Sequence, residues 1–370
     1  MSRFARASSS RLRIPVPNPD LARLPVYQPG RAAPAGAVKL ASNENPYGPS
    51  SAALLAIRRF CAVERYPDGS GSSLRRALGR SLGLRPESIL LGAGSDEIGD
   101  FIAHAYLQRG DSVVYPRHTF IRYPMLAQSV GARRIVSDVR PDFSVDVPDL
   151  LRAIRTARPK LVCLANPNNP TGACVNRKDL LSILERTPGR TLIVLDEAYF
   201  EYARLSPGHP DGIRWIRRFP NLLVLRTFSK IYALASLRVG YAAAHPAIVS
   251  ELNKVRPPFN VSAVALAAAE ASLSDAAHVR RCAAKNASER DRLSSRLAAL
   301  GVQVFPSPGN FLMIDRLPGR LDGPTCFRDL ASRGVIIRDL IPYGLRDHIR
   351  VTVGTPAEND RFLRAMRDLS

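Results

Sequence analysis

The sequence of 370 residues has no apolar run that approaches the roughly 18 to 20 residues needed to span a membrane. Its first twenty residues are basic and rich in serine, but they contain no apolar segment, so we expect no secretory signal. The segment is also short for an organellar transit peptide and soon meets proline. We therefore expect a loosely docked N-terminal arm on a cytoplasmic protein.

Cysteine is scarce and scattered. The five residues are Cys61, Cys163, Cys174, Cys282 and Cys326, and they form no CxxC pair or Cys/His ligand spacing. An odd number of isolated cysteines is typical of free thiols in a reducing compartment. The sequence thus predicts no disulfide framework and no metal site.

Lysine is rare, since it supplies only six of the 53 basic residues. A net charge of +21 is compatible with nucleic-acid binding. However, the arginines are spread over the whole chain, and no stretch interleaves basic and aromatic residues as a single-strand platform would. We expect no nucleic-acid partner. The stretch "RTFSKIYALASLRVGY", 226–241, then poses the question of why Lys230 is a lysine.

Between about residues 74 and 255, short apolar runs alternate with helical patterns. This alternation predicts an α/β domain with a mostly parallel sheet and helices on both faces. The runs "SILLGAG", "DSVVYP", "RRIVSDV", "KLVCLANP", "TLIVLDEAY" and "NLLVLRT" are expected as buried strands of parallel type, with helices at 72–83, 95–108, 122–131, 148–157 and 177–186.

The pattern changes after Pro257-Pro258. A helical stretch at 261–300 precedes short apolar segments, and a last helix is expected after Thr355-Pro356. We predict an N-terminal arm and part of a small domain over 1–50, a large α/β domain over 51–256, and a small α+β domain over 257–370.

Polar side chains follow the predicted strands. "GAGSDE" comes after one run and opens a helix, which favours a phosphate site, although a plain turn capped by Ser95 or Asp96 is an alternative. "NPNNPTG" at 166–172 supplies Asn169, with an ordinary turn as the alternative. Ligands of open α/β sheets lie beyond the carboxyl ends of the strands, so these groups should meet at one edge.

Two further runs end in groups with a clear chemistry. Asp196 and Tyr199 follow one strand, and a buried carboxylate such as Asp196 needs a partner. Lys230 follows the next. An amine, an acid, an amide, a phenol and a phosphate cup together suit pyridoxal phosphate, with Arg238 as a further phosphate anchor. Lysine is then required, because a guanidinium stays protonated and cannot form an imine.

The sequence resembles the fold-type I, pyridoxal-phosphate-dependent aminotransferases of class I/II, and among them the histidinol-phosphate aminotransferase branch. The resemblance runs over nearly the whole chain and follows eleven motifs in order. These are "VYQPG", "KLASNENPYGPS", "RYPDGSG", "LLGAGSDEI", "TFIRYP", "NPNNPTG", "VLDEAY", "TFSKIYALASLRVGY", "PSPGNFLM", "IIRD" and "IRVTVGT".

The resemblance implies a role for each matched residue. Lys230 would form the Schiff base and then move the proton, and Asp196 would pair with the pyridinium nitrogen. Tyr199 and Asn169 would contact the ring oxygen, and Phe120 would stack on the ring. The residues implied around the phosphate are Gly94, Ser95, Asp96, Thr227, Ser229 and Arg238.

The resemblance also implies a homodimer with shared active sites, in which Tyr66 reaches the phosphate of the neighbouring subunit. Tyr27 and Asn45 would line the substrate entrance. Arg338 and Arg350 would hold the anionic group of the substrate, although a plain surface position is an alternative for Arg338.

The implied reaction is ping-pong transfer of the amino group of glutamate to imidazole-acetol phosphate. Ile231, Ser236 and the short segment 31–38 depart from the family pattern, and we expect the two larger side chains to narrow the space near Lys230. The alternatives are an aromatic or other amino-acid aminotransferase and a threonine-phosphate decarboxylase. A basic nucleic-acid-binding protein on an inactive scaffold is the alternative outside enzymology.

Overall fold

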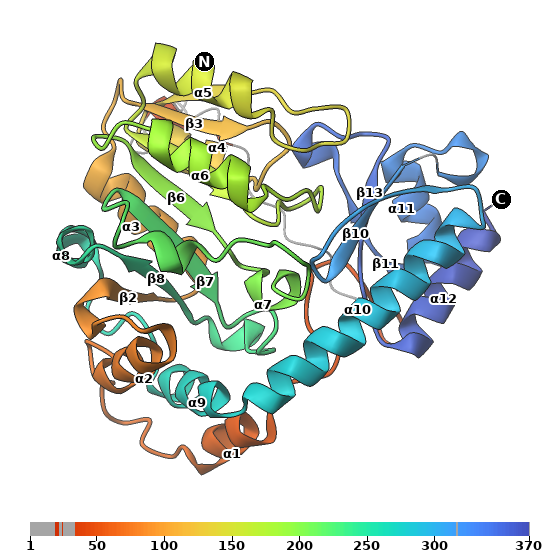
Figure 1. Cartoon of the computed structure of the whole chain (residues 1–370). Helices are drawn as coiled ribbons and strands as arrows, with labels where there is room; N and C mark the ends of the chain where they lie inside the picture. Colours follow the sequence, from red (N-terminus) through yellow and green to blue (C-terminus); the bar gives the residue numbers. More distant parts are fainter. Residues whose placement is uncertain (1–18, 22–23, 25–33, 316, 370) are drawn as a thin grey trace, which may run out of the picture.

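The computed structural model describes residues 19–21, 24, 34–315 and 317–369. A large α/β domain lies beside a smaller α+β domain, and the long helix α10 (Ala276–Ala298) runs between them (Figure 1). Within the described residues, no helix combines the length and the apolar character needed to cross a bilayer.

The large domain is built on a seven-stranded sheet with the strand order β2-β8-β7-β6-β5-β3-β4. The strands are β2 (Ile89–Gly92), β3 (Ser112–Pro116), β4 (Arg133–Ser137), β5 (Leu161–Ala165), β6 (Leu192–Asp196), β7 (Leu222–Thr227) and β8 (Gly240–Ala244). The predicted mostly parallel sheet is confirmed, because β3 to β7 all pair in parallel.

Two strand predictions need correction. β8 was not expected, and it pairs antiparallel with both β7 and β2, so the run at 89–92 has no parallel neighbour. β4 is not a buried strand, since it lies at the sheet edge and four of its five residues are at least partly exposed. β5 and β6 are buried throughout, which is why they read as continuous apolar runs.

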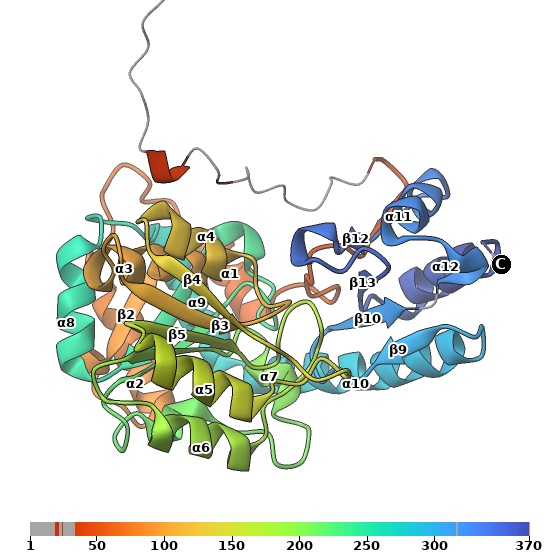
Figure 2. The same cartoon turned by 90° about the horizontal axis from the view of Figure 1, so that it is seen from above.

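Helices cover both faces of this sheet. Those on one face are α3 (Ser95–Tyr106), α4 (Arg122–Ser129) and α8 (Pro246–Val255), and those on the other are α2 (Ser72–Leu82), α5 (Val147–Ala157), α6 (Arg177–Arg186) and α9 (Ala263–Ser274). Figure 2 shows α5 and α6 across the sheet from α4. The five helices predicted from the sequence end within two residues of the observed bounds. α1 (Ser51–Arg59), the short α7 (Phe200–Ala203) and α8 were not predicted.

The helical stretch expected at 261–300 is two helices, separated at Asp275, whose side chain caps α10. α9 packs against α1 and α2, and its buried alanines share the core of the large sheet. Packing therefore assigns α9 to the large domain. We propose that the division between the domains falls within α10 rather than after residue 256.

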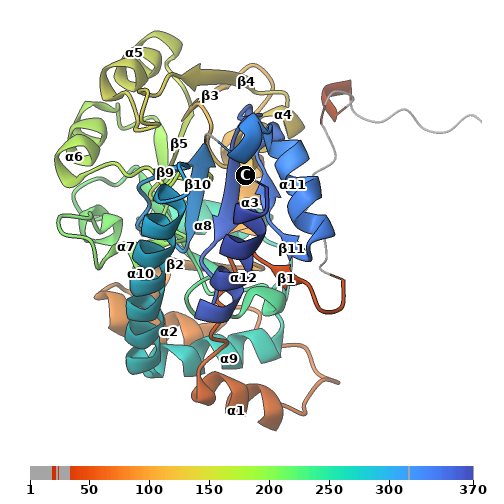
Figure 3. The ribbon, with the colours of Figure 1, turned by 90° about the vertical axis from the view of Figure 1, so that its right-hand side faces the viewer.

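The small domain has a four-stranded antiparallel sheet and a parallel two-stranded sheet (Figure 3). The strands are β9 (Gln303–Phe305), β10 (Phe311–Asp315), β12 (Arg338–Asp339) and β13 (Ile349–Thr352) in the first sheet, and β1 (Val38–Lys39) and β11 (Val335–Ile336) in the second. The helices are α11 (Gly323–Ser332) and α12 (Pro356–Arg367). Because β1 pairs with β11, residues 38–39 belong to this domain, although α1 further along the chain packs on the large one.

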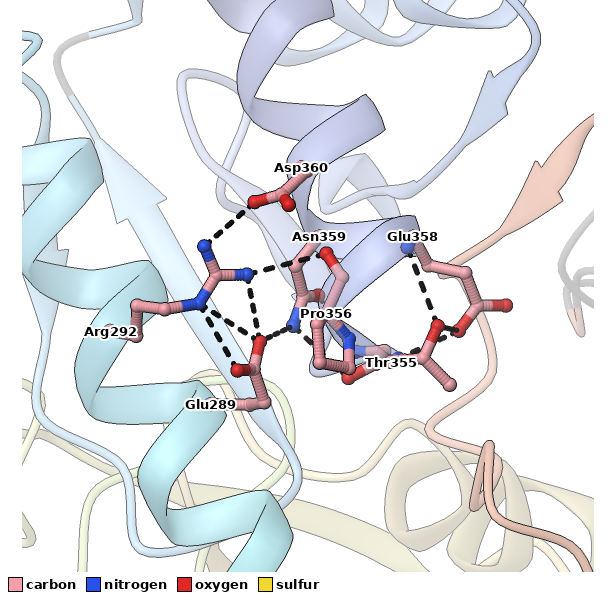
Figure 4. Close-up of polar contacts among 8 residues, drawn as sticks. Glu289, Arg292, Thr355, Pro356, Glu358, Asn359 and Asp360 are labelled. Carbon is pink, nitrogen blue, oxygen red and sulfur yellow. Dashed lines mark hydrogen bonds and ion pairs between the residues drawn. The ribbon is translucent and has the colours of Figure 1, made fainter.

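A polar cluster fastens α12 to α10, and we call it the clasp (Figure 4). Arg292 of α10 contacts Glu289 at 2.8 Å and Asp360 of α12 at 2.7 Å. The amide of Asn359 donates to Glu289 at 2.9 Å. α12 starts at Pro356 as predicted, and Thr355 and Glu358 form a capping box before it. The clasp thus fixes the chain that follows β13.

Candidate active site

A cavity lies beyond the carboxyl ends of β5, β6 and β7, where the small domain meets the large one. It encloses about 200 Å³. The residues that line it are Ala41, Ser42, Asn43, Ser95, Asp96, Phe120, Ala165, Pro167, Asn169, Asp196, Ala198, Tyr199, Thr227, Ser229, Lys230, Arg238, Arg338, Tyr343 and Arg350. The strand ends predicted to meet at one edge therefore do meet there.

Lys230 brings a partly buried amine into the cavity from the loop after β7. Its Nζ atom donates to the carbonyl of Ser42 at 3.1 Å. Burial, and then the nearby Arg350 guanidinium, lower the pKa of Lys230 to about 8. About a tenth of the amine is then unprotonated at pH 7, which is the form that attacks a carbonyl carbon.

Asp196 ends β6 with a buried carboxylate that forms no ion pair within the part of the chain that the structure describes. Its hydrogen bonds come from the backbone N–H of Ala198 at 3.0 Å and the hydroxyl of Tyr123 at 3.1 Å. Burial raises the pKa of Asp196 to about 6, and these two neutral donors offset only part of that effect. A cationic ligand atom in the cavity would supply the partner that a buried carboxylate needs.

Tyr199 and Asn169 face the same space from two loops. The Tyr199 hydroxyl accepts a hydrogen bond from the Asn43 amide at 2.9 Å, and burial raises the pKa of this phenol. The Oδ1 atom of Asn169 accepts from an Nη atom of Arg350. With Oδ1 engaged, the Nδ2 group of Asn169 is the one that can donate to a ligand.

The start of α3 forms an anion-binding cup. Gly94 is the N-cap residue, with φ of 85°, and no side chain caps this helix, so neither Ser95 nor Asp96 is the cap of the alternative reading. A Cβ atom on Gly240 would lie 2.7 Å from the backbone nitrogen of Ser95. The glycine there therefore allows β8 to approach the cup closely.

Three side chains complete the cup. Arg238 donates to the Ser229 hydroxyl at 3.2 Å, and the backbone N–H of Ser229 donates to the Thr227 hydroxyl at 3.1 Å. Phe120 lines the cavity after β3 and meets Tyr123 edge to face, with ring centroids 5.8 Å apart. The cup, the aromatic ring, the amine and the acid lie around one cavity.

Arg338 and Arg350 come from β12 and β13 and are direct partners in the antiparallel register. Both are buried and line the cavity, so the surface alternative for Arg338 is wrong. Arg350 also donates to the carbonyl of Ala41 at 2.6 Å, while its buried Nε atom has no partner among the described residues. Two guanidinium groups on neighbouring strands have the charge and the donors that suit an anionic group.

A family comparison agrees with this geometry. Residues 35–366 match the family model described as aminotransferase class I and II. The chain belongs to this family. It is an aminotransferase.

Individual relatives resemble the aminotransferase over nearly its full length. Histidinol-phosphate aminotransferase 2 of Pseudomonas fluorescens strain Pf-5 is 42% identical over 94% of this chain and 95% of the relative. Histidinol-phosphate aminotransferase 1 of Thiobacillus denitrificans is 44% identical over 95% of this chain and 92% of the relative. The solved structure of histidinol-phosphate aminotransferase from Sinorhizobium meliloti, in complex with pyridoxal-5'-phosphate, has a TM-score of 0.86 and 29% identity. That alignment covers 100% of this chain and 98% of the other.

The donor set of the aminotransferase fits pyridoxal phosphate. Lys230 offers an amine for the aldehyde carbon, and Asp196 offers a buried carboxylate with a raised pKa for a protonated ring nitrogen. The cup of backbone N–H groups at α3, with Arg238, suits the phosphate ester.

Three predicted site residues within the described part of the chain do not line the cavity: Gly94, which is the N-cap residue of α3, Asn45 and Tyr66. Asn45 is buried, donates to the carbonyl of Ile231 at 2.7 Å and is not among the residues that line the cavity, so its place at the substrate entrance stays a prediction. Tyr66 is 81% exposed and stacks on Phe259 with ring centroids 4.6 Å apart. Tyr27 lies outside the described residues.

Ile231 and Ser236 do not line the cavity either, which corrects the expectation that they narrow it. Ile231 is fully buried against Cys282 and Ala283 of α10. Ser236 is exposed. The larger side chain of Ile231 therefore packs between the lysine loop and α10 and does not face the cavity.

The sequence reasoning missed Asn43, Tyr123 and Tyr343. Asn43 stands inside the motif "KLASNENPYGPS", where its neighbour Asn45 was chosen instead. Tyr123 follows Phe120 by three residues, which places its phenol one helical turn away. Tyr343 lines the cavity from the small domain, and no pattern in its surroundings signals this position.

Proposed function

We propose that this aminotransferase binds pyridoxal phosphate and transfers the amino group of glutamate to imidazole-acetol phosphate, giving histidinol phosphate. The observation that supports the cofactor assignment is that one cavity holds Lys230, a partly buried amine with a lowered pKa, and Asp196, a buried acid that makes no ion pair with a described residue. The substrate assignment is supported by the names of the most similar relatives, which match over nearly the whole chain.

When bound, pyridoxal phosphate supplies an electron sink that stabilises negative charge at the carbon that loses a proton. In the proposal Asp196 keeps the ring nitrogen protonated, and Tyr199 and Asn169 donate to the ring oxygen. Phe120 holds the ring from one face. Lys230, once released from the cofactor, accepts the proton at its Nζ atom and returns it to the neighbouring carbon.

The phosphate ester would sit at the start of α3. The backbone N–H groups of Ser95 and Asp96 belong to the first turn of α3 and form the positive end of the helix dipole, where an anion is stabilised. Arg238, Thr227 and Ser229 surround the same space from β7 and the following loop.

The substrates share one anion site in this proposal. A ping-pong reaction uses the same cavity for glutamate and for a phosphate-bearing acceptor. Arg338 and Arg350 lie side by side and can bind a carboxylate or a phosphate in turn.

We further propose a homodimer with shared active sites. Six of the ten exposed large apolar side chains among the described residues come from α1, the loop after it and the segment at the end of α8: Leu54, Leu55, Val63, Tyr66, Val255 and Phe259. Such a concentration favours a protein interface. Tyr66 would then complete the phosphate site of the partner.

A cytoplasmic location is also part of the proposal. It is supported by five cysteines that form no disulfide.

The cofactor and the substrate are tested together. We expect purified protein to show a visible absorbance band that disappears in Lys230→Ala and persists in the control Lys254→Ala, whose side chain lies on the surface of α8. With glutamate as donor, imidazole-acetol phosphate should react faster than phenylpyruvate. A preference for phenylpyruvate would favour the aromatic aminotransferase instead.

The shared site is tested by mixing two inactive variants, Tyr66→Ala and Lys230→Ala. If each site uses residues of both subunits, random reassociation should recover roughly a quarter of the wild-type activity, because mixed dimers contain one intact site. No recovery in a mixture that forms mixed dimers would contradict sharing.

A further inference from the structure

Asn43 lies where the small domain meets the cavity. Its side chain and backbone are buried, and its φ of 53° is left-handed. Its backbone N–H donates to the Thr352 hydroxyl at 2.9 Å, and its carbonyl accepts from the Asn310 amide at 3.0 Å. Both partners belong to the small domain, so the position of Asn43 is set by that domain.

The same neighbours set the direction of the Asn43 side-chain amide. The hydroxyl of Thr352 accepts from the backbone of Asn43 and donates its own proton to Oδ1, at 3.2 Å. Nδ2 is therefore left facing Tyr199, and it donates to the phenol oxygen at 2.9 Å. An amide turned the other way would leave the proton of Thr352 facing a donor.

This contact has a consequence for the phenol of Tyr199. A phenol has one proton. Because the Nδ2 group of Asn43 is a donor, the Tyr199 hydroxyl cannot direct its own proton toward that group. The ring is held edge to face against Phe311, with centroids 5.0 Å apart. The remaining direction for the Tyr199 O–H group is the cavity, which Tyr199 lines.

We propose that Asn43 is a positioning residue that makes Tyr199 a hydrogen-bond donor toward the ring oxygen of the cofactor. The small domain fixes this donor through Thr352 and Asn310. The inference rests on the proposed cofactor site and adds to it a residue that acts only through Tyr199. Burial raises the pKa of Tyr199, and the Asn43 hydrogen bond opposes that effect.

The test is the pH at which the absorbance of the lysine-linked cofactor changes. A donor to the ring oxygen lowers this midpoint, because it favours the form with negative charge on that oxygen. Asn43→Gly removes the amide and suits the left-handed backbone. We expect it to raise the midpoint by roughly half a unit to one unit. Asn43→Asp should raise it further, since a carboxylate draws the phenol proton away from the cavity.

The decisive measurement is a double-mutant cycle with Tyr199→Phe. If Asn43 acts through the phenol, Asn43→Gly should shift the midpoint in the wild-type background and leave it unchanged when residue 199 is phenylalanine. Equal shifts in both backgrounds, or no shift in either, would overturn the proposal. Cofactor affinity, measured by dialysis, should likewise fall in Asn43→Gly when residue 199 is tyrosine and stay unchanged when it is phenylalanine.

Variants at Thr352 give an independent reading. Thr352→Ser keeps the hydroxyl and should titrate as the wild type, whereas Thr352→Val should move the midpoint in the same direction as Asn43→Gly by a smaller amount. A wild-type protein with no pH-dependent band would instead refute the cofactor assignment itself. The two failures are thus distinguishable.

Discussion

The cavity and the clasp both place charged side chains in partly or fully buried positions, and they treat them differently. In the clasp, hydrogen bonds from Arg292 and Asn359 overcome the effect of burial and lower the pKa of Glu289. In the cavity, burial dominates, raising the pKa of Asp196 and lowering that of Lys230. Paired charges stabilise the fold, while the charged groups of the cavity, whose oppositely charged neighbours do not offset burial, are suited to a ligand.

The largest expected effect in either region is the loss of activity when Lys230 is replaced. Replacing it with methionine removes the amine and keeps a side chain of similar length, so activity should fall on the order of 10³-fold or more. The cofactor-free protein should still fold, because no stabilising ion pair is lost. Steady-state assays and circular dichroism measure the two effects. An active Lys230→Met variant would show that the amine is not the reacting group.

The same substitution should show that the protonated Lys230 lowers the stability of the cofactor-free fold. The pKa of Lys230 is about 8 in the folded chain and 10.5 in the reference state, so its stabilising contribution is present above pH 10.5 and lost as pH falls toward 8. Cofactor-free Lys230→Met should therefore be more stable than the wild type at pH 7, by on the order of 2 kcal/mol. Denaturant unfolding at pH 7 and pH 10 should show the difference shrinking at the higher pH.

Asp196→Asn should have the next largest effect on activity, a loss of roughly 10²-fold, because an amide cannot hold the ring nitrogen protonated. Without cofactor, the raised pKa of Asp196 means that its contribution to stability is full below pH 3.8 and lost as pH rises through 6. Asp196→Asn should lack this decline. Added cofactor should restore stability to the wild type and do little for the variant, as melting temperatures would show.

In the clasp, Asn359 should matter for stability and hardly for activity. Its buried side chain accepts from the N–H of Gly354 at 2.9 Å and donates to Glu289 and to the Gly354 carbonyl. Asn359→Ala should lower the unfolding free energy by about 2 kcal/mol. kcat should stay near the wild-type value. A large loss of kcat at unchanged stability would show that the clasp is part of the active site.

The two regions also differ in how far the sequence predicts them. The edge that holds Asp196, Asn169 and Lys230 follows from apolar runs that end in polar residues, since strand direction alone brings such ends together. Asn43 could not be found that way. Its role depends on contacts with Thr352 and Asn310, residues about 270 to 310 positions later in the chain.

Long-range contacts also explain the errors in the fold. β8 reads as "GYAAA", a run too poor in branched residues to stand out, and it becomes a strand because β2 and β7 flank it. Asn45 and Asn43 are two residues apart in one motif, and only the fold decides which of them faces the cavity. The pairing of Arg338 with Arg350 likewise depends on the register between two short strands.

The smallest predicted effect compares an ion pair of the clasp with one on the surface. Arg292 bridges Glu289 and Asp360 while about two-thirds of its side chain is covered, so Arg292→Ala should lower the unfolding free energy by about 1 kcal/mol. Lys254→Ala removes the exposed pair with Glu251 and should change it by less than about 0.5 kcal/mol. High salt should abolish most of the small loss in Lys254→Ala and only part of the loss in Arg292→Ala, because it screens the exposed pair more fully than the clasp. Equal losses in both variants would mean that the clasp is held by Asn359 and the capping box, with its guanidinium contributing no more than any surface charge.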